Sequence, residues 1–428
     1  MNAPLEIALF RAEITPPPGY PLCAGWYPPC RGVADRLSAN GIVLRPGDQP
    51  PIVLCALDWA ELSNGEYRLW VERIAQAAGT APDRVALHCI HAHDAPWPDR
   101  DAQRFLDERG FPGVIMRQPW TDGALDAVAR AVKEACSQPG EPVESIRVGR
   151  GRVHEVAGNR RLIGPDGKSL GVRWTRCRNP ELRAMPEGSI DPWLKTLSFR
   201  GGGRKLAALH YYAVHPTSYD GTGLVTHDFV GIARETLARE EGLSHLYFTE
   251  CAGDITCGKY NDGVADNRAL FAGRIAAAMR EAEANAVTVA PGPIRWVTRE
   301  VVLPPLAAHD PGAIFADPQS TDAARSRAAL ILAYRARQAL PITVSALHLG
   351  DAAAIVHLPG ESFMDYQLYA QSLRPGAVVM VPSYGDCGPG YIPLARSYEE
   401  GGYEPTDAFC SPESEAILKR AIADVLTS

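Results

Sequence analysis

The chain has 428 residues, of which 46% are hydrophobic and 22% are charged, a balance that is ordinary for a globular protein with a sizeable core. Its formal net charge of -7 is spread along the chain without a long basic block, which excludes nucleic acid as an expected partner. No uncharged apolar run approaches the ~18 residues of a transmembrane helix, so no membrane anchor is expected.

The first six residues lack a basic segment followed by an apolar one, so we expect no secretory signal. The ten cysteines include no Cys-x-x-Cys pair, and several lie inside apolar runs, where a free cysteine behaves as a small hydrophobic residue. These features favour a reducing, cytoplasmic location without disulfides. Nothing in the sequence indicates the oligomeric state.

Strand and helix patterns alternate along the whole chain. Strands rich in Val, Ile and Leu and bounded by Pro and Gly are predicted over 7–14, 41–44, 51–58, 84–91, 146–153, 207–214, 245–249, 293–303, 342–349, 352–358 and 377–382. Helices are predicted over 64–78, 121–136, 228–240, 266–285, 321–339 and 412–426, with a further start near 362–369. This order predicts the α/β class, with mixed β-sheets and flanking helices, and leaves α+β as the alternative.

The chain is expected to form one domain over residues 1–428. No internal repeat is evident, and the best linker candidate, 289–293, is too short to be more than a loop. Segments 94–120 and 154–192 are long, rich in Pro, Gly and Arg, and poorly periodic. Such segments are typical of lids or pocket walls, although plain surface loops remain the alternative.

Three of the apolar runs end on residues that can bind zinc, namely His91, His215 and Glu361. Catalytic zinc usually takes three protein ligands, for which two His and one Glu are a standard set, and keeps a fourth position for water. Ligands at the ends of rigid strands from distant parts of the chain suit a preorganised hydrolytic site. The alternative is that three core strands happen to end in polar residues.

His91 and His93 are two residues apart, so in a strand they would face the same side, while His88 would face the core. One of the pair can bind metal and the other can contact the substrate. Asp94 could orient either imidazole as a hydrogen-bond acceptor or assist proton transfer.

Several segments, in order, resemble the catalytic domain of the neutral/alkaline, non-lysosomal ceramidases and their short bacterial relatives. The segments that carry the resemblance are Phe10 to Gly19 (FRAEITPPPG), Ile90 to Pro96 (IHAHDAP), Val214 to Ser218 (VHPTS), Thr226 to Gly231 (THDFVG), Ala252 to Thr256 (AGDIT), Leu358 to Glu361 (LPGE), and Gly390 to Pro393 (GYIP) followed by Tyr403-Glu404. The similarity spans nearly the whole chain.

The resemblance implies that zinc is bound by His91, His215, Glu361 and Tyr391. It also implies that His93, Arg160 and Tyr403 lie beside the metal, where they would bind the substrate carbonyl and the tetrahedral intermediate. Thr256 stands where ceramidases have a functionally important Ser.

This chain also departs from the family pattern. Thr256 is β-branched and followed by Cys257 instead of Pro, and Asp94 replaces the Ser of the first histidine motif. The sequence ends soon after the last motif, so the immunoglobulin-like C-terminal domain of long ceramidases is expected to be missing. These departures favour a ceramidase-like scaffold with a substrate other than ceramide.

The resulting hypothesis is a zinc-dependent amidohydrolase that cleaves a C–N amide bond of a small, soluble acyl-amide. An anionic group on the substrate is predicted from the cations of segment 154–192, namely Arg160, Arg161, Lys168, Arg173, Arg176, Arg178 and Arg183. The alternatives are a zinc esterase or lactonase on the same site, a ceramidase proper, and a non-catalytic binding protein that keeps the scaffold.

Overall fold

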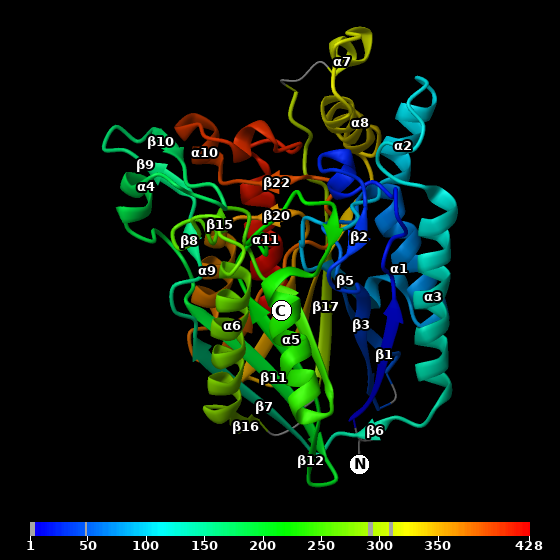
Figure 1. The fold of residues 1–428 in the computed structure, drawn as a ribbon. Coiled ribbons are helices and arrows are strands. Elements are labelled where there is room, and N and C mark those ends of the chain that lie inside the picture. Colours follow the sequence, from blue (N-terminus) through cyan, green and yellow to red (C-terminus); the bar gives the residue numbers. More distant parts are fainter. Residues whose placement is uncertain (1–4, 48, 290–293, 308–310) are drawn as a thin grey trace.

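The computed structural model describes residues 5–47, 49–289, 294–307 and 311–428 (Figure 1). The predicted loop 289–293 lies outside the described residues from position 290 onward, as does Pro293 of the predicted strand 293–303. The same holds for the first four residues, on which the expectation about a secretory signal partly rests. Within the described ranges, every helix is too short or too polar to cross a membrane.

The fold is built from three copies of one β-β-β-α-β-α unit. The first contains β1 (Leu5–Glu13), β3 (Ser38–Pro46), β4 (Ile52–Leu57), α1 (Asn64–Ala78), β5 (Val85–Cys89) and α3 (Gln118–Ser137). The second contains β7 (Ser145–Arg152), β11 (Trp193–Gly201), β12 (Arg204–Tyr212), α5 (Asp228–Glu241), β14 (Ser244–Thr249) and α6 (Asn267–Ala284). The third contains β17 (Ile294–Val301), β18 (Ile342–Leu349), β19 (Ala353–His357), α9 (Met364–Leu373), β21 (Val378–Met380) and α11 (Ser414–Thr427).

Strand order and direction are the same in the three units. In each, the first three strands are antiparallel neighbours, and a crossover helix brings the fourth strand parallel to the third at the sheet edge. The short strands β6 (Glu141–Pro142) and β16 (Val287–Val289) extend the first two sheets beside their first strands. The topology therefore repeats although no repeat is evident in the sequence, because only strand order is shared.

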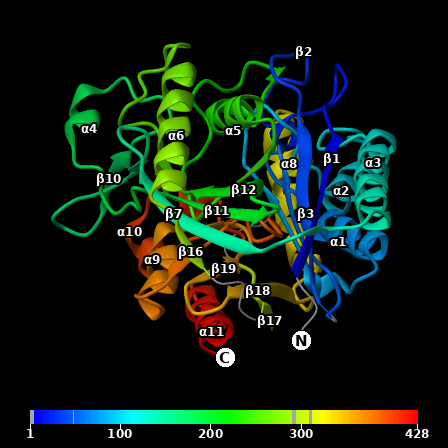
Figure 2. The same ribbon diagram turned by 90° about the horizontal axis from the view of Figure 1, so that it is seen from below.

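Seen from below, the helix pairs lie outside and the three sheets lie toward the middle of the molecule (Figure 2). Strands of these sheets are consequently buried on both faces; for example, every residue of β4 and of the edge strand β5 is buried. This explains why they read as continuous apolar runs and not as alternating patterns.

One central strand, β11, was missed by the sequence prediction because its buried positions include Lys195, Thr196 and Ser198. The Lys195 ammonium donates to Asp191 at 2.5 Å and to Glu250 at 2.7 Å. A buried charge with two partners is tolerated in a core, but in the sequence it looks like a surface residue.

The third and fourth strands of every unit end at the same end of the molecule. Because the second strand runs against the third, each connection from first to second strand also lies at that end. These connections carry β2 (Gly32–Val33) in the first unit, β8 (Gly158–Asn159), β9 (Arg161–Ile163), β10 (Ser169–Val172) and α4 (Pro180–Ala184) in the second, and α7 (Gly312–Ala316) and α8 (Asp322–Ala336) in the third. Figure 1 shows all three groups in the upper half of the molecule.

Both segments that looked irregular in sequence contain regular structure. Segment 94–120 holds α2 (Arg100–Asp107), which begins at Asp99, whose carboxylate accepts the amides of Asp101 and Ala102. The remaining elements are β13 (Leu224–Val225), β15 (Ile255–Thr256), β20 (Glu361–Ser362), β22 (Tyr391–Ile392) and α10 (Ala395–Glu400), with three short 3-10 turns at Cys23–Gly25, Pro82–Arg84 and Glu404–Thr406.

Candidate metal centre

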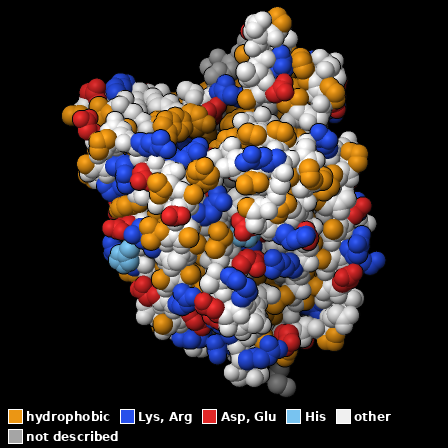
Figure 3. All heavy atoms as spheres, in the orientation of Figure 1, with side chains coloured by type: hydrophobic (Ala, Val, Ile, Leu, Met, Phe, Trp, Pro, Cys, Tyr) orange, Lys and Arg blue, Asp and Glu red, His pale blue; other side chains and the backbone are white. Residues whose placement is uncertain are grey.

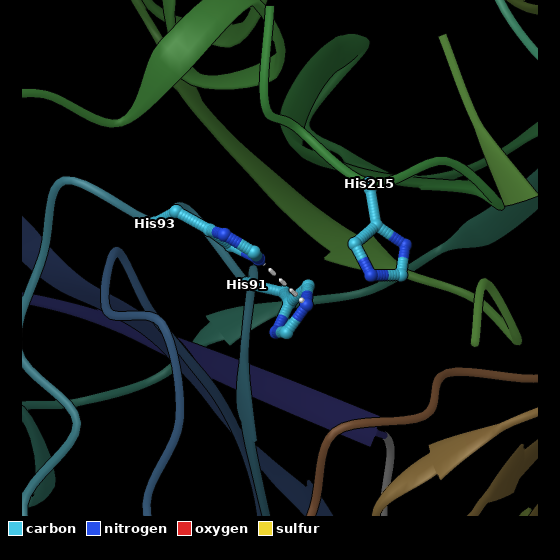
Figure 4. Close-up of side chains that lie close together, drawn as sticks. All are labelled: His91, His93 and His215. Carbon is cyan, nitrogen blue, oxygen red and sulfur yellow. Dashed lines mark hydrogen bonds between the residues drawn. The ribbon is translucent and has the colours of Figure 1, made fainter. Parts of the chain in front are cut away.

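His91 lies two residues beyond the end of β5 and not within the strand. Its φ of 69° is in the left-handed region, which costs a non-glycine residue about 1–3 kcal/mol and is concentrated at functional sites. The prediction that His91 and His93 face the same side because both lie in a strand is therefore wrong in its premise, since the strand ends at Cys89. The two rings nevertheless face the same space, with Nε2 atoms 3.1 Å apart (Figure 4). His88 faces the core, as predicted.

Backbone carbonyls set the orientation of two imidazoles. His91 Nδ1 donates to the carbonyl of Ala60 at 3.2 Å, and His215 Nδ1 donates to the carbonyl of Ile255 at 3.0 Å. Since a carbonyl only accepts, each ring carries its hydrogen on Nδ1 and leaves Nε2 bare when neutral. This is the arrangement in which a histidine binds a metal through Nε2.

The two bare nitrogens converge on Glu361, which follows β19. Its Oε2 lies 3.2 Å from His91 Nε2 and 3.1 Å from His215 Nε2. Burial by itself would raise the pKa of Glu361, whereas His91 and His215 outweigh burial and lower this pKa when their rings are protonated. Burial lowers the pKa of His215 to about 4, so this ring is neutral.

Two of these atoms, His215 Nε2 and Glu361 Oε2, are buried without a hydrogen-bond partner among the described residues. Buried polar atoms without partners are uncommon, and a bound ion or water molecule is one of the explanations for them. Imidazole nitrogens and a carboxylate are the donors that zinc and similar divalent metals take. The residues present therefore fit a bound transition metal.

Among His91, His93 and His215, His93 is the most exposed, with 19% of its side chain accessible. The Tyr27 hydroxyl donates to Asp220, so its oxygen can accept from His93 Nδ1, which lies 3.1 Å away. The Nε2 of His93 is then bare as well, and its distance to the other rings makes it a possible metal ligand in place of a substrate contact. Burial and the neighbouring His91 lower the pKa of His93.

Tyr391 is the backbone partner of Glu361, because β20 and β22 pair in parallel with these residues in register. Its ring lies 5.7 Å from that of Tyr403, and the Arg160 guanidinium lies over both rings, at 5.1 and 5.4 Å. Burial opposes the Arg160 charge, but Tyr391 and Glu404 outweigh it and raise its pKa. The structure thus brings together the residues that the resemblance grouped.

Glu404 holds this arginine in place. Its two carboxylate oxygens accept from Arg160 Nε and Arg161 Nη1, each at 2.6 Å, and none of its side chain is exposed. Arg160 also donates to the carbonyl of Gly253 at 2.8 Å. In the sequence, Glu404 was noted only as part of the Tyr403-Glu404 motif. Its pairing with Arg160 could not be predicted, because it joins segments about 240 residues apart.

Sequence reasoning missed two further residues of this site. Glu61 follows β4, is fully buried, and lies 3.5 Å from His91 Nδ1 with both oxygens lacking a hydrogen bond within the described chain. Tyr384 follows β21 and stacks on His91, with ring centroids 4.3 Å apart. Glu61 occupies the same place after the third strand of its unit as Glu361 does, a signal that only the repeated topology reveals.

Asp94 does not contact an imidazole. Its carboxylate accepts the amides of Thr222 and Gly223 and the Thr222 hydroxyl, at 3.0–3.2 Å, and so holds that loop. The hydroxyl of Thr256 is also engaged by backbone: it donates to the Arg173 carbonyl at 3.2 Å and accepts from the Gly258 amide at 3.3 Å. A catalytic role for Thr256 stays a prediction.

Most cations of segment 154–192 are occupied within the protein. Arg173 is fully buried and donates only to backbone carbonyls. Arg161 pairs with Glu404 and Glu400. Arg176 is 43% exposed and lies 3.3 Å from Asp220, beside Tyr27 and His93. Lys168, Arg178 and Arg183 donate to backbone carbonyls, so Arg176 is the cation of this segment that lies beside the site histidines, and Asp220 already pairs with it.

Two solved structures share this fold over nearly the whole chain. A ceramidase complexed with C2 superposes with a TM-score of 0.73 at 16% sequence identity, covering 99% of this chain and 75% of that one. The neutral ceramidase from Pseudomonas aeruginosa gives a TM-score of 0.71 at 16% identity, covering 100% and 74% respectively. No family model and no curated protein matches the chain. The fold is thus neutral-ceramidase-like, which confirms the predicted resemblance and α/β class.

Proposed function

We propose that the chain is a zinc-dependent hydrolase of C–N amide bonds. The observation that carries the proposal is the convergence of two carbonyl-tethered imidazoles, His91 and His215, on the buried carboxylate of Glu361. These three residues would hold the metal, with Tyr391 as the fourth candidate because it pairs with Glu361. When bound, zinc would polarise the scissile carbonyl and lower the pKa of a water to ~7.

The residues around this centre suit the charges of amide hydrolysis. Negative charge develops on the carbonyl oxygen as the bond is attacked, and Arg160 with Tyr403 would stabilise it. One such contact is worth about 2.7–4 kcal/mol of transition-state stabilisation. Because Glu404 fixes Arg160 before the substrate arrives, little reorganisation is needed during the reaction.

His93 would move the proton. Its bare Nε2 can accept a proton from the attacking water and return it to the leaving nitrogen, while Tyr27 holds the ring. The alkoxide of an ester is a better leaving group than an amine and needs less acid assistance. A zinc esterase or lactonase on the same site would therefore depend less on His93. Replacing His93 by Gln should therefore lower amide turnover more than ester turnover if the amide is the natural substrate.

The surface near the centre favours a substrate with an apolar acyl group. Trp174 is 50% exposed and packs edge-on against Tyr403, with centroids 4.8 Å apart, so aromatic rings lead from the surface to Tyr391. Figure 3 shows hydrophobic side chains in the upper part of this face, and Leu170 of β10 is 59% exposed. Arg176 supplies a cation that could meet an anionic group. A soluble N-acyl amino acid combines both features, with ceramide as the alternative substrate.

Metal analysis of the purified chain, with a panel of substrates, tests the proposal. We expect one zinc per chain, loss of both metal and activity in His215→Ala, and retained zinc in the matched control His210→Gln, whose ring bonds Thr196 and His245 instead. Full zinc occupancy in His215→Ala would refute the ligand set. Zinc far below one per chain in the native protein would favour a non-catalytic binding protein.

A further inference from the structure

A cavity lies between the first and third units, apart from the candidate metal centre. Its volume is about 380 Å³, within the ~300–1,000 Å³ typical of small-molecule sites. Its walls come from α1, β5, the start of β18 and the end of β19. None of the proposed metal ligands lines it.

Two histidines of the cavity wall form a directed hydrogen-bond chain. His88 Nδ1 donates to the carbonyl of Ser383 at 2.7 Å, which leaves His88 Nε2 to accept from His357 Nδ1 at 2.9 Å. The Nε2 of His357 is therefore bare in the neutral pair. It is buried, in a residue only 4% exposed, and has no hydrogen-bond partner within the described ranges.

The neutral pair follows from its surroundings. Burial lowers the pKa of His88 to about 4, and burial together with His88 lowers that of His357. Because both protons of the neutral pair lie on Nδ1 atoms, the chain ends in an acceptor, His357 Nε2. A ligand that satisfies this end must be a hydrogen-bond donor.

The charged groups on the cavity wall favour a cation. Glu72, Asp83 and Glu300 are exposed, and Arg68 is partly buried. None of the four forms an ion pair with another described residue. Asp386 also lines the cavity, but it is paired with Arg337. Three free carboxylates against one guanidinium leave this wall negative.

The remaining wall includes apolar side chains such as Val71, Val85 and Ile342. We propose that this cavity binds a small organic amine, whose ammonium group donates to His357 Nε2 and whose alkyl stem lies against these apolar side chains. The carboxylates at the edge of the cavity compensate the charge of the bound ammonium. The site does not depend on the proposed amidase activity.

Binding at this cavity must be separated from binding at the metal centre, because the two are neighbours. Ser383 accepts from His88, and the next residue, Tyr384, stacks on His91. Hexylamine should therefore be titrated calorimetrically into the full chain before and after chelator treatment, with 1-hexanol and hexanoate as matched probes. We expect 1:1 binding of hexylamine that survives the chelator, and at least tenfold weaker binding of the other two.

Two kinds of variant locate the site. His357→Phe keeps an aromatic side chain and removes both ring nitrogens, including the Nε2 acceptor, so hexylamine should bind about tenfold or more weakly. The double variant Glu72→Gln/Glu300→Gln changes only exposed side chains, so it should fold and should weaken binding mainly at low salt. Glu144→Gln, an exposed carboxylate outside the cavity, is the control and should leave binding unchanged.

Three results would overturn the proposal. Equal binding of 1-hexanol would show that no cation is recognised, and loss of hexylamine binding with the chelator would assign it to the metal centre. Native affinity in His357→Phe and in the double variant together would exclude this cavity.

Discussion

Replacing Glu404 by Gln should destabilise the protein markedly, although the side chain is changed by a single group. The carboxylate is fully buried and accepts 2.6 Å bonds from two buried arginines, Arg160 and Arg161. Removing one partner of a buried ion pair costs about 3–5 kcal/mol, because the remaining charges are left uncompensated. An unfolding entropy of about 2.1 cal/mol/K per residue gives roughly 0.9 kcal/mol/K for a chain of this length, so Tm should fall by about 3–6 °C.

Glu400→Gln is the matched control for this measurement. Glu400 contacts Arg161 at 3.0 Å and the exposed Arg396 at 3.4 Å but is itself 19% exposed, so each of its pairs is worth at most ~1 kcal/mol, or about 1 °C in Tm. Differential scanning calorimetry of both variants with bound metal compares them directly. Equal Tm values in the two variants would refute the reasoning.

The pH dependence of the Glu404 effect has a definite sign. Burial would raise the pKa of Glu404, but Arg160 and Arg161 lower it below its value in the unfolded chain, which is ~4.3. A lowered folded pKa contributes stability that is complete above the unfolded pKa and is lost as pH falls through the folded pKa. The Tm difference between native protein and Glu404→Gln should therefore be constant above about pH 6 and shrink in acid below ~4.3.

Three further predictions concern catalysis. Arg160→Ala and Tyr403→Phe should lower kcat while zinc content, measured by emission spectrometry, stays near normal; native kcat in both would exclude them from the reaction. Thr256→Val should keep most of kcat and lose about 1 kcal/mol of stability, because its hydroxyl bonds backbone; a loss of turnover of about a thousandfold or more would restore a nucleophilic role. In side-by-side assays, soluble N-acyl amino acids should be cleaved faster than a fluorescent ceramide, and increasingly slowly as salt screens Arg176; fast ceramide cleavage alone would reverse this order.

The sequence was sufficient where local pattern decides structure. α1 was predicted with both boundaries correct, and the strands that precede His91, His215 and Glu361 were found because they are short apolar runs. The orientation of the imidazole rings could not be predicted from the sequence. The acceptors that fix them are backbone carbonyls, which every residue type carries. Glu61 was missed since its role depends on how the first unit packs against the third. The cations of segment 154–192 suggested a substrate site, but in the fold most of them form hydrogen bonds or ion pairs with other groups of the protein.

The three connections between first and second strands have a consequence for how such a protein can change. Each interrupts a hairpin at the end that carries the metal centre, while the opposite ends of the sheets are closed by short turns. A hairpin loop can gain or lose residues without shifting the register of the strands it joins. These three connections can therefore be exchanged one at a time, while the strand ends that position His91, His215 and Glu361 keep their geometry.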